Sequence, residues 1–308
     1  MEKIKVYCKL LFNPERLIWI LLGKPFPGHL ISDKTAIRIF YWLRFRKCLN
    51  LKSPQTFNEK ILWLSLYNRK EIYTKMADKY EAKLFVNNRL KDLYKEIDRI
   101  ENITPKTLQI CKSFDDINFK ILPSRYVIKT THDSGSVILV SEDRPLIYNQ
   151  AKQIIERSLK NNYYWYSREW VYKNIVPRVI VEEFIETNSL FPVDYKFYCF
   201  NGTPKMCAII SGREGKPKMD FVNLKYERLP YKQRYNNSER LPVKPKCWNE
   251  MINFSEELSK DIPFLRVDFF SKKNGDCLVG ELTFYPSSGL IPFDNPEHDI
   301  EIGKWLKL

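Results

Sequence analysis

The sequence is poor in the residues on which many catalytic sites depend. Three histidines occur in 308 residues, and no Ser-His-Asp or Cys-His arrangement supports nucleophilic catalysis. The seven cysteines are scattered, odd in number and without a Cys-x-x-Cys pair, which excludes a disulfide framework. We interpret them as free thiols of a reducing, cytoplasmic compartment, and we expect any catalysis to depend on other side chains.

Long apolar runs are also missing. The longest run near the start, LIWILL at residues 17–22, is about a third of the length that a membrane-spanning helix needs. No small-residue cleavage site follows it, so it is not a convincing signal peptide. The run is interpreted as a buried helix, with an amphipathic segment lying on a membrane surface as the alternative.

Acidic residues are in deficit. The chain has 37 Asp and Glu against 51 Lys and Arg, a formal net charge of +14, which indicates an acidic partner. No helix-turn-helix, zinc-finger or RNA-recognition pattern is present, so nucleic acid is not the expected partner. Nucleoside triphosphates, anionic lipid surfaces and acidic polysaccharides remain open.

Helical patterns come first along the chain and strands later, which predicts an α+β fold. Residues 1–75 are predicted to be helical, with Thr56 and Glu59 forming a capping box at a helix start. The later elements are expected as helices at 77–90, 149–159 and 248–260, a hairpin of strands 126–130 and 136–142, a strand at 178–186, an antiparallel pair at 193–202 and 203–212, a polar loop at about 212–245 and a hairpin over 266–289.

Lys129 lies at the end of the apolar strand YVIKT, which is followed by a loop of small and polar residues at 132–136. A terminal lysine and the backbone N–H groups of such a loop can surround a polyphosphate. The Walker pattern GxxxxGK[ST] is absent, and an ordinary hairpin that happens to end in lysine is the alternative.

Two further strands carry charged residues among apolar ones. Glu182 and Glu183 in VEEFIE are able to aim a carboxylate and peptide groups at an adenine edge, or else they lie on the solvated face of an edge strand. Asp194 and Lys196 project from one face of their strand because they are two residues apart. That pair is either a ribose and phosphate contact or a cross-strand salt bridge.

Asp268 and Glu281 lie on the two strands of the last hairpin, RVDFFSKKNGDCLVGELTFYPSSG. A two-residue turn at Asn274-Gly275 would place these carboxylates directly opposite each other, where like charges repel unless a cation bridges them. Two carboxylates with phosphate and water are a ligand set that suits Mg²⁺. The sequence therefore predicts that this pair holds magnesium.

Taken in order, the strand-Lys-loop, EEFI, D-x-K and the RVD…E-x-T-x-x-P-x-x-G motifs resemble the ATP-grasp superfamily of ATP-dependent carboxylate–amine ligases, over about residues 77–290. A narrower resemblance covers nearly the whole chain. The segments TFNEKILWLSLYNR, ADKYEAKLFV, YSREWVYKNIVPRVIVEEFIE, DYKFYCFNG and RVDFF…GELTFYPSSG are similar to the TupA-like, teichuronopeptide-synthesis ATP-grasp proteins of bacterial surface-polysaccharide gene clusters.

The resemblance implies an ATP-grasp fold, in which two α+β subdomains clamp Mg-ATP. The implied organisation is a helical N-terminal region at 1–75 and a catalytic region at 76–308. Within the latter, a nucleotide-lid subdomain would occupy about 126–180 and a metal-binding core about 181–295.

The resemblance also implies roles for the nucleotide-binding positions. Lys79 and Lys129 match two phosphate-binding lysines, the loop at 132–136 matches a flexible lid over the β- and γ-phosphates, and residues 182–185 match the hinge that contacts adenine. The implied lid, hinge and ribose-phosphate residues are His132, Ser134, Gly135, Ser136, Glu182, Glu183, Phe184, Ile185, Asp194 and Lys196.

Asp268 and Glu281 match magnesium ligands, and Arg266 matches a residue beside the acyl phosphate, so Arg266 and Lys196 are the implied catalytic residues. Thr283 stands where the superfamily usually carries Asn. Because a hydroxyl is a poorer ligand than an amide carbonyl, the number of bound magnesium ions stays open.

By this resemblance the chain would be a bacterial cytoplasmic ligase, free or at the inner face of the membrane. Its substrates would be ATP, a uronic-acid carboxylate of an anionic surface polysaccharide or precursor, and an amino acid or other amine. The alternatives are a glycosyltransferase of the same pathway, although Asp-x-Asp is absent, and a non-catalytic nucleotide- or polyanion-binding protein. The segment Arg168, Glu169 and Trp170 serves either packing or substrate binding.

Overall fold

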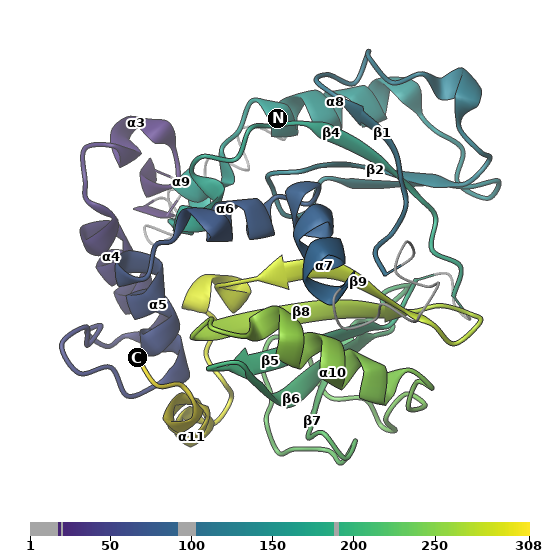
Figure 1. The fold of residues 1–308 in the computed structure, drawn as a ribbon. Helices are drawn as coiled ribbons and strands as arrows, with labels where there is room; N and C mark the ends of the chain where they lie inside the picture. Colours follow the sequence, from purple (N-terminus) through teal and green to yellow (C-terminus); the bar gives the residue numbers. More distant parts are fainter. Residues whose placement is uncertain (1–17, 20, 92–102, 188–190) are drawn as a thin grey trace.

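The computed structural model describes residues 18–19, 21–91, 103–187 and 191–308. In this part of the chain two antiparallel sheets are surrounded by helices (Figure 1). The helices are α3 Pro25–Gly28, α4 Asp33–Phe45, α5 Phe57–Tyr67, α6 Glu71–Ala77, α7 Glu81–Lys91, α8 Tyr148–Leu159, α9 Tyr163–Ser167, α10 Trp248–Ser259 and α11 Pro296–Trp305, with 3-10 turns η2 Phe119–Ile121, η3 Trp170–Tyr172 and η4 Pro286–Gly289.

The apolar run LIWILL is only partly described, because residues 17 and 20 lie outside the described residues. Trp19 stacks on Phe40 of α4 with ring centroids 4.4 Å apart, but Ile18 and Leu21 are exposed, and Trp19 and Leu22 are half-buried, so the described part of the run is not the fully buried helix that was expected. Among the helices of the described ranges, none has the length and apolar character needed to cross a membrane.

Side-chain caps fix where α5 and α7 begin. The Thr56 hydroxyl accepts from the Glu59 backbone N–H and the Glu59 carboxylate accepts from that of Thr56, so the predicted capping box is confirmed. The helix predicted over 77–90 was wrong at its start. Asp78 Oδ1 accepts from the backbone of Tyr80 and Glu81 at 2.8 and 3.1 Å, which separates α6 from α7 and leaves residue 79 in the break.

The first sheet has the strand order β1-β4-β2-β3, in which every neighbouring pair is antiparallel. It contains the predicted hairpin of β2 and β3. Helix α8 packs on this sheet, and Ile155 of α8 shares a buried cluster with Ile128 and Val181. The four strands are β1 Thr107–Cys111, β2 Tyr126–Thr130, β3 Val137–Val140 and β4 Val179–Glu183, so the sheet extends on both sides of the predicted lid range 126–180.

The second sheet has the order β7-β6-β5-β8-β9 and is also antiparallel throughout. The predicted turn between β5 and β6 is confirmed, with left-handed Asn201 (φ 47°) and Gly202 (φ 81°). The expectation of a plain loop over 212–245 was wrong, because β7 lies within it; the buried Asp220, paired with Arg228 at 3.2 Å, interrupts the apolar pattern there. The strands are β5 Asp194–Phe200, β6 Thr203–Ser211, β7 Lys218–Val222, β8 Phe264–Ser271 and β9 Cys277–Thr283.

The β8–β9 hairpin reaches the predicted register by a different route. Its loop is one residue longer than a two-residue turn: Lys272 N–H donates to Asp276 O at 2.8 Å, and Gly275 is left-handed at φ 96°. A bulge next to Asp268 then compensates, so that Asp268 lies opposite Glu281 as predicted.

The side chains of each strand alternate between the two faces of the second sheet. One face packs against α10, where Phe197 lies 4.8 Å from the Trp248 ring and Phe269 is fully buried. The other face carries Asp194, Lys196, Asp268 and Glu281 toward the first sheet, which lies above it in Figure 1. The apolar residues of β5 and β8 thus anchor the strands, and the intervening polar residues are free to build a site.

Candidate active site

A cavity of about 220 Å³ lies between the two sheets. Its apolar lining includes Val127 and Leu139 from the first sheet and Phe270 from the second. The cavity brings together most of the predicted binding residues, which are Lys79, Lys129, Glu182, Glu183, Phe184, Ile185, Asp194, Lys196, Asp268 and Glu281.

Two lysines share the buried carboxylate of Glu182. Lys83 Nζ lies 2.5 Å from Glu182 Oε1, and Lys129 Nζ pairs with Glu182 Oε2. Burial disfavours the charged carboxylate, but Lys129 and Lys83 outweigh it and hold the pKa of Glu182 below its usual range. The Glu182 carboxylate therefore pairs with two lysines. One of them, Lys83 of α7, is a partner that the sequence analysis missed.

Lys79 stands in the break between α6 and α7. Its backbone N–H donates to Thr131 O at 3.0 Å and its ammonium donates to the carbonyl of Asp133, which tie it to the end of β2. Burial lowers the pKa of Lys79, although Glu281 and Asp133 act to raise it. Lys79 is thus a cation held between the two sheets.

The residues of the loop at 132–136 are not part of the cavity lining. His132 Nε2 lies 3.1 Å from Ser158 O, in the last turn of α8, and 3.0 Å from Asn161 O, just after the helix. Ser136 Oγ donates to Asp133 Oδ1 at 2.6 Å, and nothing lies within 4 Å of a Cβ built on Gly135. The loop meets a cavity-lining residue at the carbonyl of Asp133, which accepts from the Lys79 ammonium.

The predicted hinge follows the end of β4. The Glu183 carboxylate accepts from Lys106 N–H at 2.8 Å, and the Glu183 N–H donates to Lys106 O at 2.9 Å. Arg125 lies over the Phe184 ring, with its guanidinium carbon 4.3 Å from the centroid. These contacts fix the strand end, so that residues 182–185 follow one edge of the cavity.

Asp194 and Lys196 face the cavity from β5. Arg213 donates from Nε to Asp194 Oδ2 at 2.6 Å, and Lys196 Nζ is 4.0 Å from Asp194 Oδ1 but pairs more closely with Asp268. The sequence left open a ribose and phosphate contact or a cross-strand salt bridge. In the structure Lys196 forms a salt bridge to Asp268 on the neighbouring strand, and Asp194 pairs mainly with Arg213, which the sequence analysis did not identify.

Asp268 is 2% exposed and already neutralised by protein cations. Arg266 binds it with two nitrogens, Nε–Oδ1 at 2.6 Å and Nη2–Oδ2 at 2.7 Å, and Lys196 pairs with Oδ2. Arg266 Nη2 also donates to Thr283 Oγ1 at 3.0 Å. Glu281 has no ion pair among the described residues, so the charge argument for a bound cation rests on Glu281 alone.

Arg168 links this region to the N-terminal helices. It is 1% exposed, caps α9 in a left-handed conformation (φ 59°), and donates from Nη2 to Leu22 O and Gly28 O at 3.1 and 2.8 Å. Arg168 therefore has a packing role, whereas the Glu169 carboxylate accepts a hydrogen bond from Ser288 Oγ at 2.8 Å. Trp170 lies against Arg69, 5.8 Å from ring centroid to guanidinium carbon.

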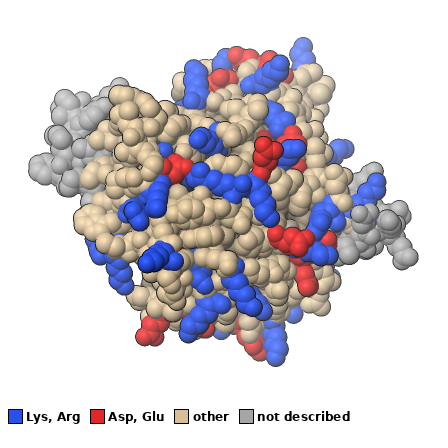
Figure 2. Space-filling model, turned by 60° about the vertical axis from the view of Figure 1, so that its left-hand side comes forward, with Lys and Arg blue, Asp and Glu red and all other residues tan. Residues whose placement is uncertain are grey.

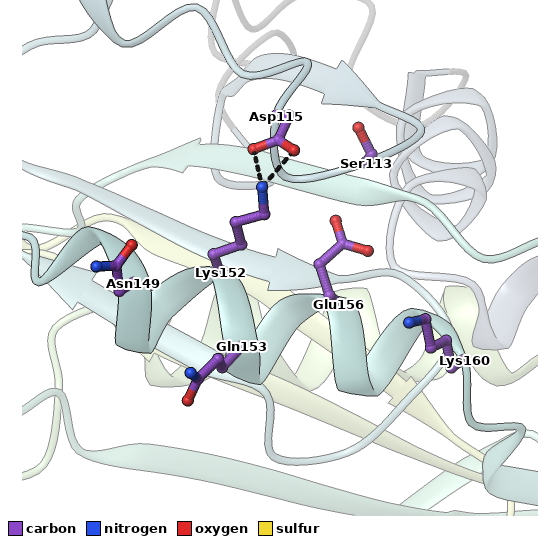
Figure 3. A pocket seen from close by; sticks show the side chains of 7 residues that line it. All are labelled: Ser113, Asp115, Asn149, Lys152, Gln153, Glu156 and Lys160. Atoms are coloured by element: carbon purple, nitrogen blue, oxygen red, sulfur yellow. Dashed lines mark hydrogen bonds and ion pairs between the residues drawn. The ribbon is translucent and has the colours of Figure 1, made fainter.

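A larger hollow, of about 700 Å³, lies on the surface along α8 (Figure 3). Lys152 reaches Asp115 Oδ1 at 2.7 Å, and Glu156 accepts from Phe114 N–H at 3.0 Å. These polar groups satisfy one another and none of the predicted site residues lies there, so the smaller cavity between the sheets is the better candidate site.

Comparison with known proteins identifies the family. A family model described as TupA-like ATPgrasp matches residues 59–307. No curated protein matches the chain significantly. Solved structures with similar folds include a D-alanine–D-alanine ligase from Bacillus anthracis complexed with ATP (16% identity, 68% of this chain and 55% of that chain, TM-score 0.38). An L-amino acid ligase from Bacillus licheniformis is also similar (11% identity, 84% and 57%, TM-score 0.45).

N5-carboxyaminoimidazole synthetase from Staphylococcus aureus, complexed with ADP, is a third similar structure (12% identity, 67% of this chain and 43% of that chain, TM-score 0.38). The chain covers less than two thirds of each of these three proteins. The family match, by contrast, includes the cavity and both sheets. The chain belongs to the TupA-like ATP-grasp family and has the ATP-grasp fold.

Proposed function

We propose that the protein is an ATP-dependent carboxylate–amine ligase. The observation that carries the proposal is the convergence of Lys79, Lys129 and Lys196 with Asp268 and Glu281 on one cavity between two sheets. Three cations around a polar cavity suit a triphosphate, and an apolar wall beside residues 182–185 suits a purine ring. Among the structures of similar fold, the D-alanine–D-alanine ligase is complexed with ATP and the N5-carboxyaminoimidazole synthetase with ADP.

In the proposed reaction, a substrate carboxylate attacks the γ-phosphorus of ATP, giving an acyl phosphate and ADP, and an amine then displaces phosphate to form an amide. Lys79 and Lys129 would hold the phosphates, and Lys196 and Arg266 would stabilise charge on the transferring phosphoryl group. Positioned cations are the main requirement of this chemistry, which agrees with a chain that has three histidines.

The residues fit Mg²⁺ in part. Glu281 offers carboxylate oxygens without an ion pair among the described residues, and Asp268 lies opposite it. No group of three or more His, Cys, Asp or Glu side chains with metal-ligand geometry occurs in the described part of the chain, which agrees with an ion completed by phosphate and water. Magnesium would supply neutralisation of phosphate charge; Thr283, engaged by Arg266, is a weaker candidate ligand.

The carboxylate substrate is proposed to be a uronic acid of a bacterial surface polysaccharide or its precursor, and the amine an amino acid or related compound. The net charge of +14 supports an anionic substrate. Basic side chains are spread over the face seen in Figure 2 and outnumber the acidic ones among them. We place the enzyme in the cytoplasm, free or at the inner face of the membrane, where such precursors are made.

ADP release separates this proposal from its alternatives. The protein would be incubated with Mg-ATP, a panel of uronates and UDP-uronates, and a panel of amino acids, with ADP measured by a coupled assay and amides by mass spectrometry. Uronate-dependent ADP release with amide formation is expected. UDP release from a nucleotide-sugar would instead support a glycosyltransferase, and nucleotide binding without turnover a non-catalytic protein.

Nucleotide choice is tested independently of the substrate. If residues 182–185 read adenine, Mg-ADP should raise the melting temperature more than Mg-GDP or UDP-glucuronate does. Binding at a hundredfold excess over Kd adds about 2.7 kcal/mol to the free energy of unfolding. Equal shifts for all three nucleotides would contradict an adenine hinge.

A further inference from the structure

The two lysines that pair with Glu182 are held in different ways, and Lys83 of α7 is the more firmly held. Its Nζ donates to Pro105 O at 2.6 Å and to Thr107 Oγ1 at 3.0 Å. It also lies 2.5 Å from Glu182 Oε1, so that three oxygens surround an ammonium that has three N–H groups. Lys83 is outside the cavity lining. It is therefore a fixed cation, anchored at the start of β1 and the end of β4.

Lys129, on β2, is held by fewer contacts. Its Nζ pairs with Glu182 Oε2, and the ammonium has no other polar partner among the described residues. Lys129 lines the cavity, and its side chain is 17% exposed. Of the two lysines it is thus the one that is able to leave Glu182 and bind a ligand in the cavity.

The carboxylate between the two lysines is buried, because Glu182 is only 2% exposed, and it also lines the cavity. If Lys129 moved to a phosphate and no second cation were present, this carboxylate would lose its only partner, which is strongly unfavourable for a buried charge. It would also repel the phosphate. With Lys83 in place, Glu182 remains in a neutral ion pair after Lys129 has left.

Resting on the proposed nucleotide-binding role of the cavity, we propose that Lys83 is a positioning residue, which neutralises Glu182 when Lys129 moves from that acid to a nucleotide phosphate. Glu182 holds Lys129 at the cavity before nucleotide binds, and Lys83 holds Glu182 afterwards. Lys83 itself does not bind phosphate, because it lies outside the cavity lining. Its effect should therefore be confined to the phosphates of the nucleotide, and it should require the charge of Glu182.

A double-mutant cycle between Lys83 and Glu182 tests both requirements. Calorimetry at neutral pH would measure the Kd of Mg-ADP and of adenosine for wild type, Lys83→Met, Glu182→Gln and the double variant. Adenosine has the base and ribose without phosphate, so it reports on residues 182–185 alone. Lys60→Met is the matched control, because the Lys60 ammonium donates to two backbone carbonyls at 2.8 and 2.6 Å and lies outside the cavity lining.

We expect Lys83→Met to weaken Mg-ADP binding by about 5–10-fold, because Lys129 then leaves a buried acid unpaired when it binds phosphate. Its adenosine Kd should stay within about twofold of wild type. Glu182→Gln alone should bind Mg-ADP at least as tightly as wild type, since no carboxylate then competes for Lys129. In the Glu182→Gln background, Lys83→Met should change the Mg-ADP Kd by less than about twofold. Lys60→Met should change neither Kd.

The position of Lys129 gives a second measurement. In a crystal structure of wild type with Mg-ADP, Lys129 Nζ should lie within hydrogen-bond distance of a phosphate oxygen while Lys83 remains on Glu182. Lys129 still paired with Glu182 beside a bound phosphate would overturn the proposal.

Other results would also overturn the role. Wild-type Mg-ADP affinity in Lys83→Met would remove it, and an equal loss in both backgrounds would show that Lys83 does not act through Glu182. An equal loss of adenosine and Mg-ADP affinity would assign Lys83 to the shape of the hinge. If Lys83→Met does not fold, Glu182→Gln alone decides, and weaker Mg-ADP binding than wild type would contradict the proposal. Failure of the unsubstituted protein to bind Mg-ADP would instead overturn the nucleotide site itself, and it is recognisable because no variant is involved.

Discussion

The two facing carboxylates of the β8–β9 hairpin should respond in opposite ways to the same chemical change. Asp268→Asn and Glu281→Gln each remove one negative charge and keep the shape of the side chain. Asp268 pairs with Arg266 and Lys196, whose side chains are 13% and 11% exposed, whereas Glu281 has no ion pair in the described part of the chain. Removing one partner of a buried ion pair typically costs about 3–5 kcal/mol.

We therefore expect Asp268→Asn to lower the free energy of unfolding by about 3 kcal/mol, the lower end of that range. Arg266 keeps its bond to Thr283, and Lys196 keeps Asp194 at 4.0 Å, so neither cation is wholly deserted. Glu281→Gln should change stability by less than about 0.5 kcal/mol, as substitutions without a buried pair usually do.

Urea denaturation in EDTA measures the free energies of unfolding of the two variants. Repeating it with Mg-ADP tests how magnesium-dependent nucleotide binding changes in each variant. Glu281→Gln should lose most of the magnesium-dependent gain in nucleotide affinity, although its stability without metal is normal. A Glu281→Gln protein that is as unstable in EDTA as Asp268→Asn, yet still forms amide, would refute both the pairing and the proposed metal role.

The pH dependence of the free energy of unfolding at acid pH is a second test of the ion pairs of Asp268. Burial opposes ionisation of Asp268, but Arg266 and Lys196 outweigh it and hold its pKa below the usual range. A carboxyl whose pKa is lowered by folding stabilises the protein above its unfolded pKa of about 3.9, and the contribution disappears as pH falls through the folded pKa. The stability difference between wild type and Asp268→Asn should therefore shrink below about pH 4. A constant difference would contradict the ion pair.

Two further variants test the geometry around the cavity. Gly280→Ala should destabilise the protein by about 1–3 kcal/mol, because its Cβ would lie 2.5 Å from a phenyl carbon of Phe270, whereas Gly215→Ala, with nothing within 4 Å, should be neutral; equal urea midpoints would contradict this. Lys129→Met should weaken Mg-ADP binding by about 1.5–3 kcal/mol in calorimetry. Lys83→Met also removes an ion pair with Glu182, but Lys83 lies outside the cavity lining, so this variant should weaken Mg-ADP binding less. Equal losses of affinity in the two variants would show that the lysines act only through Glu182.

The hairpin shows how a sequence can predict the correct pairing from an incomplete reason. A two-residue turn at Asn274-Gly275 predicts that Asp268 faces Glu281, and the structure agrees. The loop is in fact one residue longer, and a bulge beside Gly280 restores the register. The bulge was not predictable from the turn residues, because it depends on the Phe270 ring packing across the strand where a Cβ would clash.

Sequence patterns within a few residues predicted the local structure well, but they did not predict contacts between residues that are farther apart in the chain. The capping box at Thr56 and the left-handed turn at Asn201-Gly202 involve residues within a few positions of each other. The Asp78 cap was missed although it is equally local, because the apolar pattern of the two helices continues across it. Strand β7 was missed because Asp220 is stabilised by Arg228, whose proximity only the folded chain reveals.

The same distinction explains what could be predicted of the site. Spacing and resemblance named Lys79, Lys129 and Lys196 as phosphate-binding cations, but not that each already has an oxygen partner in the fold. Lys129 pairs with Glu182, Lys196 with Asp268, and Lys79 binds a backbone carbonyl. These partners offset the repulsion that three converging cations would otherwise suffer, so the lysines can converge on one cavity. A bound triphosphate would then compete with built-in acceptors, and its affinity would depend on magnesium to neutralise the acids that it displaces.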